Sequence, residues 1–235
     1  MKDVAMETFA ERVIAYNTNL NFDQALPDGI RVMNPFRENP EALEVSSAFY
    51  RKYYNDQRQR HLILGINPGR FGAGVTGIPF TDTKRLVEKC GLQIRGISTH
   101  EPSSVFVYEV IDAYGGVDAF YGDFYINSVS PLGFVRINER GKEVNYNYYD
   151  DPKLQASLYN FMLQSVRTHI SMGIHTDVCF CLGSGKNFRF LEQMNREHDL
   201  FKKIIPLDHP RFVVQYRSKQ MPEYVKKFVT LLKRK

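Results

Sequence analysis

Short apolar runs that stop abruptly at a glycine or a polar residue recur along the chain, with helix-like segments between them. The runs cover residues 62–64, the segment FYINSV within 122–130, and residues 178–182 and 203–207. Continuous apolar runs of this length are typical of parallel strands that are buried on both faces. Strands that alternate with helices favour the α/β class, here with a central, mainly parallel four-stranded sheet.

Helices are predicted between these runs, where apolar residues recur at helical spacing. Pro152 suits the first turn of a long helix that Gly173 can terminate, and Gly91 can end another. The segment 105–111 fits either a strand or the start of a helix. The predicted helices cover residues 3–16, 41–54, 83–90, 152–172 and 222–232, with one more opening at the GSGKNF segment.

The composition is that of a globular domain. Of the 235 residues, 43% are hydrophobic and 24% are charged, which excludes disordered, collagen-like and coiled-coil chains. The length favours a single domain over 1–235, with the N-terminal helices of residues 1–60 packed on it. The apolar runs are too short for a membrane span, and the N-terminus, MKDVAMETFAERV, lacks the apolar core of a secretory signal. We therefore expect an intracellular protein that does not bind membranes.

The number of cysteines and the net charge limit which cofactors and partners the chain can bind. The three cysteines are too few for a disulfide framework or a four-thiolate cluster held by one chain. Cys179 and Cys181 have no partner at ligand spacing, so we expect small buried hydrophobes there and no metal or cofactor. A net charge of +5 suits a polyanionic partner such as DNA, although many basic proteins bind no nucleic acid.

Three polar residues stand where predicted strands end. Asn67 follows the first strand, Asn127 the second and His209 the fourth. In parallel sheets, the loops at the carboxyl ends of the strands build the site, so these side chains are expected to converge. A lone histidine is usually structural, but the position of His209 at the start of such a loop favours a functional role.

Two glycine-rich segments need separate interpretations. The loop of residues 65–80, GINPGRFGAGVTGIPF, allows close approach of backbone to a ligand, although turn conformation alone explains its glycines equally well. The segment GSGK at 183–186 resembles the end of a nucleotide-binding P-loop, but Phe180 stands where a glycine is required and Asn187 replaces the metal-binding Ser/Thr. A helix N-terminus capped by Ser184, in contact with a DNA phosphate, is the better interpretation.

Basic and aromatic residues interleave after His209-Pro210, in the segment RFVVQYRSK of residues 211–219. This composition suits a grip on the DNA backbone and stacking on bases, and a solvated basic loop is the alternative. The candidate DNA-binding residues are Ser184, Lys186, Arg211, Phe212, Arg217 and Lys219.

The motif G-I-N-P-G-x-F-G-x-x-x-T-G-x-P-F of residues 65–80 resembles the first motif of the single-strand-selective monofunctional uracil-DNA glycosylases. Asn127, followed by Ser-Pro-Leu at 130–132, resembles that family's Asn-x-x-Pro-Leu segment, and His-Pro at 209–210 resembles the start of its third motif. The family's Ser-Pro-Arg-Asn continuation is replaced by residues 211–214, which leaves the DNA wedge unassigned. The absence of a cysteine quartet separates the chain from the iron–sulfur uracil glycosylases.

The resemblance implies a three-layer α/β/α sandwich and a monofunctional enzyme of base excision repair. Such an enzyme flips uracil out of single- or double-stranded DNA and excises it by hydrolysis, leaving an abasic site. By the same resemblance, Asn67 positions the attacking water and His209 donates to uracil O2. Phe80 stacks on the base, and Asn127 reads its edge. Asp82 matches no catalytic carboxylate of the family and is expected to be structural. The other base-binding residues are Ile66, Gly69 and Phe71.

Three alternatives remain open from the sequence. A glycosylase with a broader range would also remove hypoxanthine, xanthine or oxidised pyrimidines. A non-catalytic DNA-binding module of the same fold is a second alternative. A nucleotide hydrolase that uses the glycine-rich loop is the third, and it would need Mg²⁺ and acidic ligands. We expect a monomer.

Overall fold

A four-stranded parallel sheet forms the centre of the computed structural model, which describes residues 7–235. The strand order is β3-β2-β6-β7, and each neighbouring pair is parallel. The predicted α/β class and mainly parallel sheet are therefore confirmed. The strands are β2 (Arg60–Gly65), β3 (Phe124–Ser128), β6 (Ile174–Leu182) and β7 (Lys203–Leu207).

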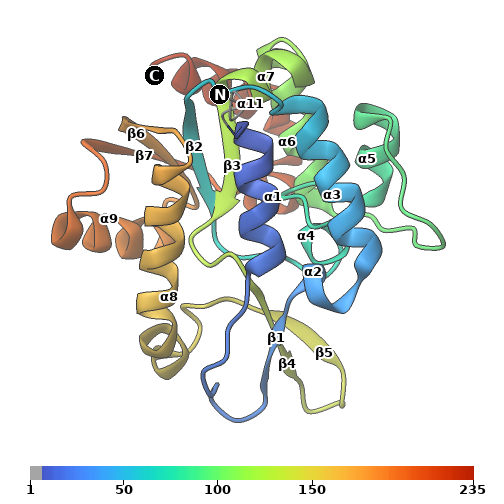
Figure 1. Ribbon diagram of the computed structural model, residues 1–235, viewed down its shortest axis with the longest axis vertical. Helices are drawn as coiled ribbons and strands as arrows, with labels where there is room; N and C mark the ends of the chain where they lie inside the picture. Colours follow the sequence, from blue (N-terminus) through green and yellow to red (C-terminus); the bar gives the residue numbers. More distant parts are fainter. Residues whose placement is uncertain (1–6) are drawn as a thin grey trace, which may run out of the picture.

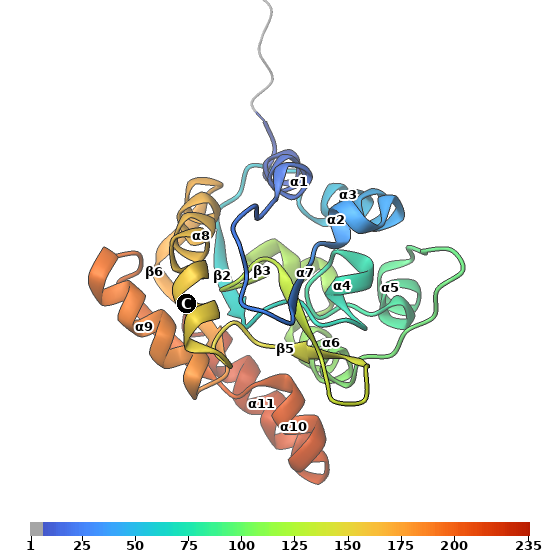
Figure 2. The same ribbon diagram turned by 90° about the horizontal axis from the view of Figure 1, so that it is seen from below.

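Helices cover both faces of this sheet and complete the predicted three layers (Figure 2). One layer contains α1 (Phe9–Asn19), α3 (Pro40–Tyr53) and α8 (Pro152–Ser171). Helix α9 (Lys186–His198) lies beside α8, where the ring centroids of Phe190 and Tyr159 are 6.0 Å apart. The opposite layer contains α6 (Pro102–Tyr114), α10 (Pro210–Tyr216) and α11 (Met221–Leu232). The shorter helices are α2 (Pro35–Glu38), α4 (Ala73–Thr76), α5 (Thr83–Cys90), α7 (Val117–Asp123) and the 3₁₀ turn η1 (Ser218–Gln220).

The central strand β2 is buried along its whole length, which explains its continuous apolar sequence. Even its first residue, Arg60, is fully buried, because several partners satisfy the guanidinium group. This group forms an ion pair with Asp56 at 2.9 Å, donates to the Tyr121 carbonyl oxygen and lies over the rings of Phe9 and Tyr54. Arg60 thus joins the layer of α1 to the sheet.

Several predicted boundaries change in the structure. Residues 105–111, which the sequence left open, lie inside helix α6. The segment after Pro210, for which a solvated loop was the alternative, forms α10 and η1. The first predicted helix is observed as α1, while its expected start at Asp3 lies outside the described residues.

A second, antiparallel sheet was not predicted. It has the order β1-β4-β5, from β1 (Ile30–Met33), β4 (Gly133–Ile137) and β5 (Glu143–Tyr146). Its strands are short; β5 is mostly exposed, and β1 and β4 are buried along only part of their length, so none carries a continuous apolar run like that of β2. This small sheet lies below the carboxyl ends of the central strands (Figure 1). Within residues 7–235, no helix is long and apolar enough to cross a membrane.

Candidate active site

A cavity of about 500 Å³ opens at the carboxyl edge of the central sheet. Its walls come from the segments that follow β2, β6 and β7, from β5 and the residues after it, and from the start of α6. Asn67 and Phe80, which follow β2, line this cavity together with His209, which follows β7. Three residues that are distant in sequence therefore meet around one space.

The backbone around β5 fixes the amide of Asn67. Its Nδ2 donates to the carbonyl oxygens of Tyr146 (3.3 Å) and Pro68 (3.4 Å), and its Oδ1 accepts the N–H of Tyr148 (3.2 Å). These contacts assign the two ends of the amide without ambiguity. Since an amide oxygen has two lone pairs, Oδ1 keeps one acceptor position for a further donor.

Phe80 adopts an unfavourable backbone conformation. Its φ is +53°, in the left-handed region that favours glycine. It is the third residue of a turn in which Thr81 N–H donates to the Ile78 carbonyl oxygen at 3.2 Å, with Pro79 in the second position. A Cβ atom on Gly65 would lie 3.0 Å from two ring carbons of Phe80. The ring therefore packs on Gly65, and only a glycine at the end of β2 leaves room for it.

His209 is the N-cap residue of α10, and its Nδ1 accepts the N–H of Arg211 at 3.2 Å. Burial, assisted by the positive charge of Arg211, lowers the pKa of His209 from 6.5 to about 4. The ring is therefore neutral at physiological pH and carries its proton on Nε2. The ring centroids of His209 and Phe80 are 6.2 Å apart. A neutral N–H donor and an aromatic ring thus border the same space.

Asn187 ties the ends of two strands together, and its role was missed from the sequence. Its Nδ2 donates to the carbonyl oxygens of Gly65 (3.3 Å) and Leu182 (2.9 Å), while its Oδ1 accepts the hydroxyl of Tyr148 (2.7 Å). It thereby links β2, β6 and the segment that orients Asn67. The only signal in the sequence was the asparagine that replaces the Ser/Thr of a P-loop.

Asn127 does not line the large cavity, although it lies near the carboxyl end of β3. Its Nδ2 donates to the Tyr125 hydroxyl (2.8 Å), and its Oδ1 accepts the N–H of Ser128 (2.7 Å). It borders a separate cavity of about 20 Å³, which is too small for a base. The sequence explains this placement: three residues separate Asn127 from Pro131, whereas the family's segment has two, so Ser128 stands at the family's asparagine position.

Ser128 lies beside the Phe80 ring, although, like Asn127, it borders the cavity of about 20 Å³ and does not line the large one. It pairs with Gly65 in the sheet, and its Oγ lies 3.3 Å from the Cβ position on Gly65, where the ring of Phe80 also packs. Ser128 as a whole is 5% exposed, and its hydroxyl forms no hydrogen bond within the described residues. Attention to the spacing before Pro131 would have identified it.

The remaining expected base-binding residues divide into two groups. Ile66 and Gly69 line the cavity. Phe71 does not: it is 51% exposed, and the Arg70 guanidinium lies 5.0 Å from its ring centroid. The structure therefore does not bring Phe71 into the cavity, because its ring is turned towards solvent.

The rim of the cavity carries most of the expected DNA-binding residues. Ser184, Lys186, Arg211 and Phe212 line it, whereas Arg217 and Lys219 lie beyond it, after α10. The expected capping role of Ser184 is wrong, because Gly185 is the N-cap of α9 and makes no side-chain cap bond. The rim also includes Gln215 and Tyr216 of α10, which the sequence did not single out.

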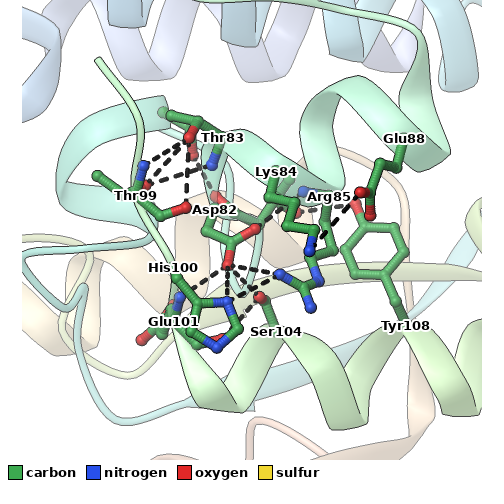
Figure 3. A network of polar contacts seen from close by, with 12 residues as sticks. Asp82, Thr83, Lys84, Arg85, Glu88, Thr99, His100, Glu101, Ser104 and Tyr108 are labelled. Atoms are coloured by element: carbon green, nitrogen blue, oxygen red, sulfur yellow. Dashed lines mark hydrogen bonds and ion pairs between the residues drawn. The ribbon is translucent and has the colours of Figure 1, made fainter.

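Asp82 is structural, as expected. Its carboxylate accepts hydrogen bonds from Arg85 N–H (2.9 Å) and Nη1 (3.2 Å), Glu101 N–H (2.7 Å) and the Ser104 hydroxyl (2.8 Å) (Figure 3). It caps α5 and joins that helix to the start of α6. With its oxygens occupied in this way, Asp82 fixes the position of the neighbouring Glu101.

A family model described as the uracil DNA glycosylase superfamily matches residues 51–233. The chain belongs to this superfamily. A crystal structure of wild-type SMUG2 from Pedobacter heparinus is 51% identical in sequence, covers 97% of this chain and 98% of its own, and superimposes with a TM-score of 0.95. No curated protein matches the chain.

The superfamily gives the reaction class. The chain is a SMUG-like DNA glycosylase, a hydrolase of N-glycosidic bonds in the uracil-directed repair of DNA. The predicted resemblance is therefore confirmed, and the cavity at the carboxyl edge is its candidate active site. Among residues 7–235, no cluster of three or more His, Cys, Asp or Glu side chains is arranged to hold a metal ion. Cys179 and Cys181 are both buried in the core.

Proposed function

We propose that this protein excises uracil from DNA after the nucleotide has been flipped into the 500 Å³ cavity. The observation that supports it is the meeting of Asn67, Phe80 and His209 around one space. Flipping costs a few kcal/mol in a duplex and less in a single strand or a mispair. The cations of the rim, Lys186 and Arg211, offset part of this cost by binding phosphates.

The leaving base becomes an anion with negative charge on O2, and a donor is needed at that point. His209 is suited to this role because its neutral ring carries one proton, on Nε2, when Nδ1 accepts the Arg211 N–H. A preorganised donor of this kind is worth roughly 2.7–4 kcal/mol of transition-state stabilisation. Phe80 offers its face to the same base.

Water must attack the sugar carbon as the base departs. The free lone pair of Asn67 Oδ1 is suited to holding this water, since the other contacts of the amide go to the backbone. An amide is a poor base. Its contribution is therefore to position the water rather than to remove its proton.

We assign edge reading to Ser128 rather than to Asn127. The amide of Asn127 is satisfied within the protein, whereas the hydroxyl of Ser128 has no partner in the described chain. A hydroxyl both donates and accepts, so it pairs with a carbonyl or an amine of the base. This chemistry favours the broader base range, with hypoxanthine and xanthine as further substrates.

A cleavage assay tests this function. Labelled oligonucleotides with one uracil, hypoxanthine or xanthine, single- and double-stranded, are incubated with the protein and treated with alkali. We expect strand breaks at uracil that persist in EDTA, and at least about a 10²-fold loss of single-turnover rate in Asn67→Ala. Asn19→Ala, on the exposed face of α1, is the matched control. Intact uracil strands with the unaltered protein would reject the function.

We also propose that residues 1–235 act as one domain and as a monomer. In support, every residue assigned a role comes from a single chain, and the candidate site needs no second copy. Excision rates per protein that change with protein concentration, together with a dimer by light scattering, would contradict this.

A further inference from the structure

Glu101 is a carboxylate in the candidate site that belongs to no recognised motif. It lies directly before α6 and lines the cavity that Asn67, Phe80 and His209 share. Its backbone is fixed: the N–H donates to Asp82 Oδ2 (2.7 Å), and the carbonyl oxygen accepts the Ser104 hydroxyl (2.8 Å). Figure 3 shows this anchoring of Glu101 beside Asp82.

The side chain of Glu101 has no partner of its own. In the part of the chain that the structure describes, its carboxyl group makes no hydrogen bond and no ion pair within 4 Å. Unpartnered carboxyl groups in largely buried positions are costly, and one that faces a ligand cavity is free to accept a proton or a hydrogen bond there. The free acceptor therefore points to a task in the reaction.

The loop that carries Asn67 is shaped around this carboxyl group. A Cβ atom on Gly72 would lie 1.8 Å from Oε2 of Glu101, and one on Gly69 would lie 3.1 Å from Oε1. Glycine at these two positions leaves space for the carboxyl group against the loop. Glu101 is thereby held next to the loop that starts at Asn67, two residues before Gly69.

The charges around Glu101 tune its protonation. Burial, reinforced by the negative charge of Asp82, raises the pKa of Glu101 to about 7, and Arg211 opposes this rise. A proton acceptor works best when its pKa lies near the working pH. The other charged and titratable groups on the surrounding elements are Arg70 of the glycine-rich loop, Arg85 and His100 beside Asp82, Asp208 and His209 before α10, and Lys186 of α9. Asp208 is paired with Lys227 at 2.7 Å.

We infer that Glu101 is a catalytic residue that accepts the proton of the attacking water. This inference rests on the proposed function. The water oxygen, positioned by Asn67, forms a bond to C1′ of the deoxyribose, while the bond from C1′ to the base nitrogen breaks. Its electron pair leaves with the base as an anion that His209 stabilises. One water proton passes to Glu101, and C1′ keeps the hydroxyl group. The protonated carboxyl group later returns its proton to the base or to solvent.

This role gives the rate a defined dependence on pH. Only the ionised carboxylate accepts a proton, so the single-turnover rate falls as pH drops through about 7. In Glu101→Gln the acceptor is absent, and the rate loses this dependence. His209 does not produce the same slope, because its own proton uptake lies at about pH 4.

The test measures single-turnover excision from a single-stranded uracil oligonucleotide between about pH 5.5 and about pH 9. We expect Glu101→Gln to be about 10²- to 10⁴-fold slower at the upper end of this range, with a flat profile and unchanged DNA affinity. Glu109→Gln, on the exposed side of α6, is the matched control and should follow the unaltered protein. Circular dichroism and the melting temperature verify that both variants are folded.

Chemical rescue gives a second readout. Formate supplies a small carboxylate to the space left in Glu101→Ala, and we expect it to restore part of the excision rate. Formate that leaves Glu101→Ala unchanged while Glu101→Gln cleaves at the unaltered rate would overturn the inference and make Glu101 a structural residue. A change confined to the DNA dissociation constant would also overturn it, because simple charge repulsion explains that result. An unaltered protein without any activity would instead contradict the proposed function.

Discussion

The protonation state of His209 decides how this side chain can act. Its Nδ1 is occupied by the Arg211 N–H, and its pKa is lowered to about 4, so it works as a neutral donor. We expect His209→Ala to lose about 10²- to 10³-fold in the rate of base release, as the removal of one oxyanion donor does. DNA binding, measured by fluorescence anisotropy, should be retained.

A control histidine lies at the other end of the sheet. His175, near the start of β6, stacks on His61 at 4.5 Å and is remote from the cavity, so His175→Ala should cleave normally. If His209→Ala instead loses its affinity for DNA and keeps its rate at saturation, the side chain grips the backbone and does not stabilise the leaving base.

Substitutions of Ser128 and Asn127 can show which of the two side chains reads the edge of the base. Ser128→Ala removes the free hydroxyl beside Phe80, and we expect about a 10-fold or larger drop in excision with little change in melting temperature. Asn127→Ala removes hydrogen bonds to Tyr125 and Ser128, so it should lower the melting temperature more than the rate. The opposite pattern, with excision lost only in Asn127→Ala, would return edge reading to Asn127.

Glu101 shows why part of the site escapes the sequence. Asn67, Phe80 and His209 follow apolar runs or belong to a long motif, and the structure brings them together. A single glutamate in the segment HEPSS carries no such signal. Its significance depends on burial and on the two glycines packed against it, which are visible only once the chain has folded.

The strands and helices also differ in how clearly the sequence predicts them. The buried strands of the central sheet were predicted because burial on both faces demands apolar residues throughout, as in β2. The strands of the small sheet have no such demand, since β5 is exposed along most of its length. Helix α10 was missed because its exposed basic and aromatic residues resemble a loop, although Pro210 after a capping His209 is a helix-start signal.

Helix α10 presents a platform for DNA at the rim of the cavity. Phe212 and Tyr216 are 37% and 61% exposed, their ring centroids are 5.7 Å apart, and the guanidinium of Arg217 lies 5.5 Å from the Phe212 ring. Exposed aromatic side chains beside a basic surface stack on unpaired bases. We expect Phe212→Ala or Tyr216→Ala to weaken binding of single-stranded DNA about 10-fold each, measured by anisotropy with an uncleavable oligonucleotide.

The excision rate at saturating protein should remain close to normal in these α10 variants. Val87→Ala, which removes an exposed apolar side chain on α5, is the control. Equal affinities of all three variants for single-stranded DNA would exclude α10 as a stacking platform. Binding would then depend on the basic side chains alone.

At the scale of the whole molecule, buried histidines make folding sensitive to acid. Burial lowers the pKa of His169 to about 3, and burial with Arg211 lowers that of His209 to about 4, against 6.5 for an ordinary histidine. As pH falls below 6.5, the unfolded chain binds protons that the folded protein does not, so stability is lost. Glu101 acts in the opposite direction: its pKa is about 7 when folded and 4.5 ordinarily, so the folded state binds the extra proton between those values.

The unfolded chain takes up protons at two histidines, whereas the folded protein takes up one at Glu101, so the free energy of unfolding falls on acidification from pH 6.5 towards pH 4.5. Urea unfolding can measure this loss. We expect His169→Leu to flatten this loss by up to about 1.4 kcal/mol per pH unit, the contribution of one proton. Removal of this imidazole breaks the hydrogen bond between Nε2 and Ser165 Oγ (3.3 Å), but Ser165 keeps its hydrogen bond with the Tyr16 hydroxyl (2.7 Å), and Nδ1 has no partner among the described residues. Glu101→Gln should steepen the loss, since the compensating proton uptake disappears. If both variants keep the slope of the unaltered protein, these groups titrate alike in the folded and unfolded chains, and burial does not shift their pKa values.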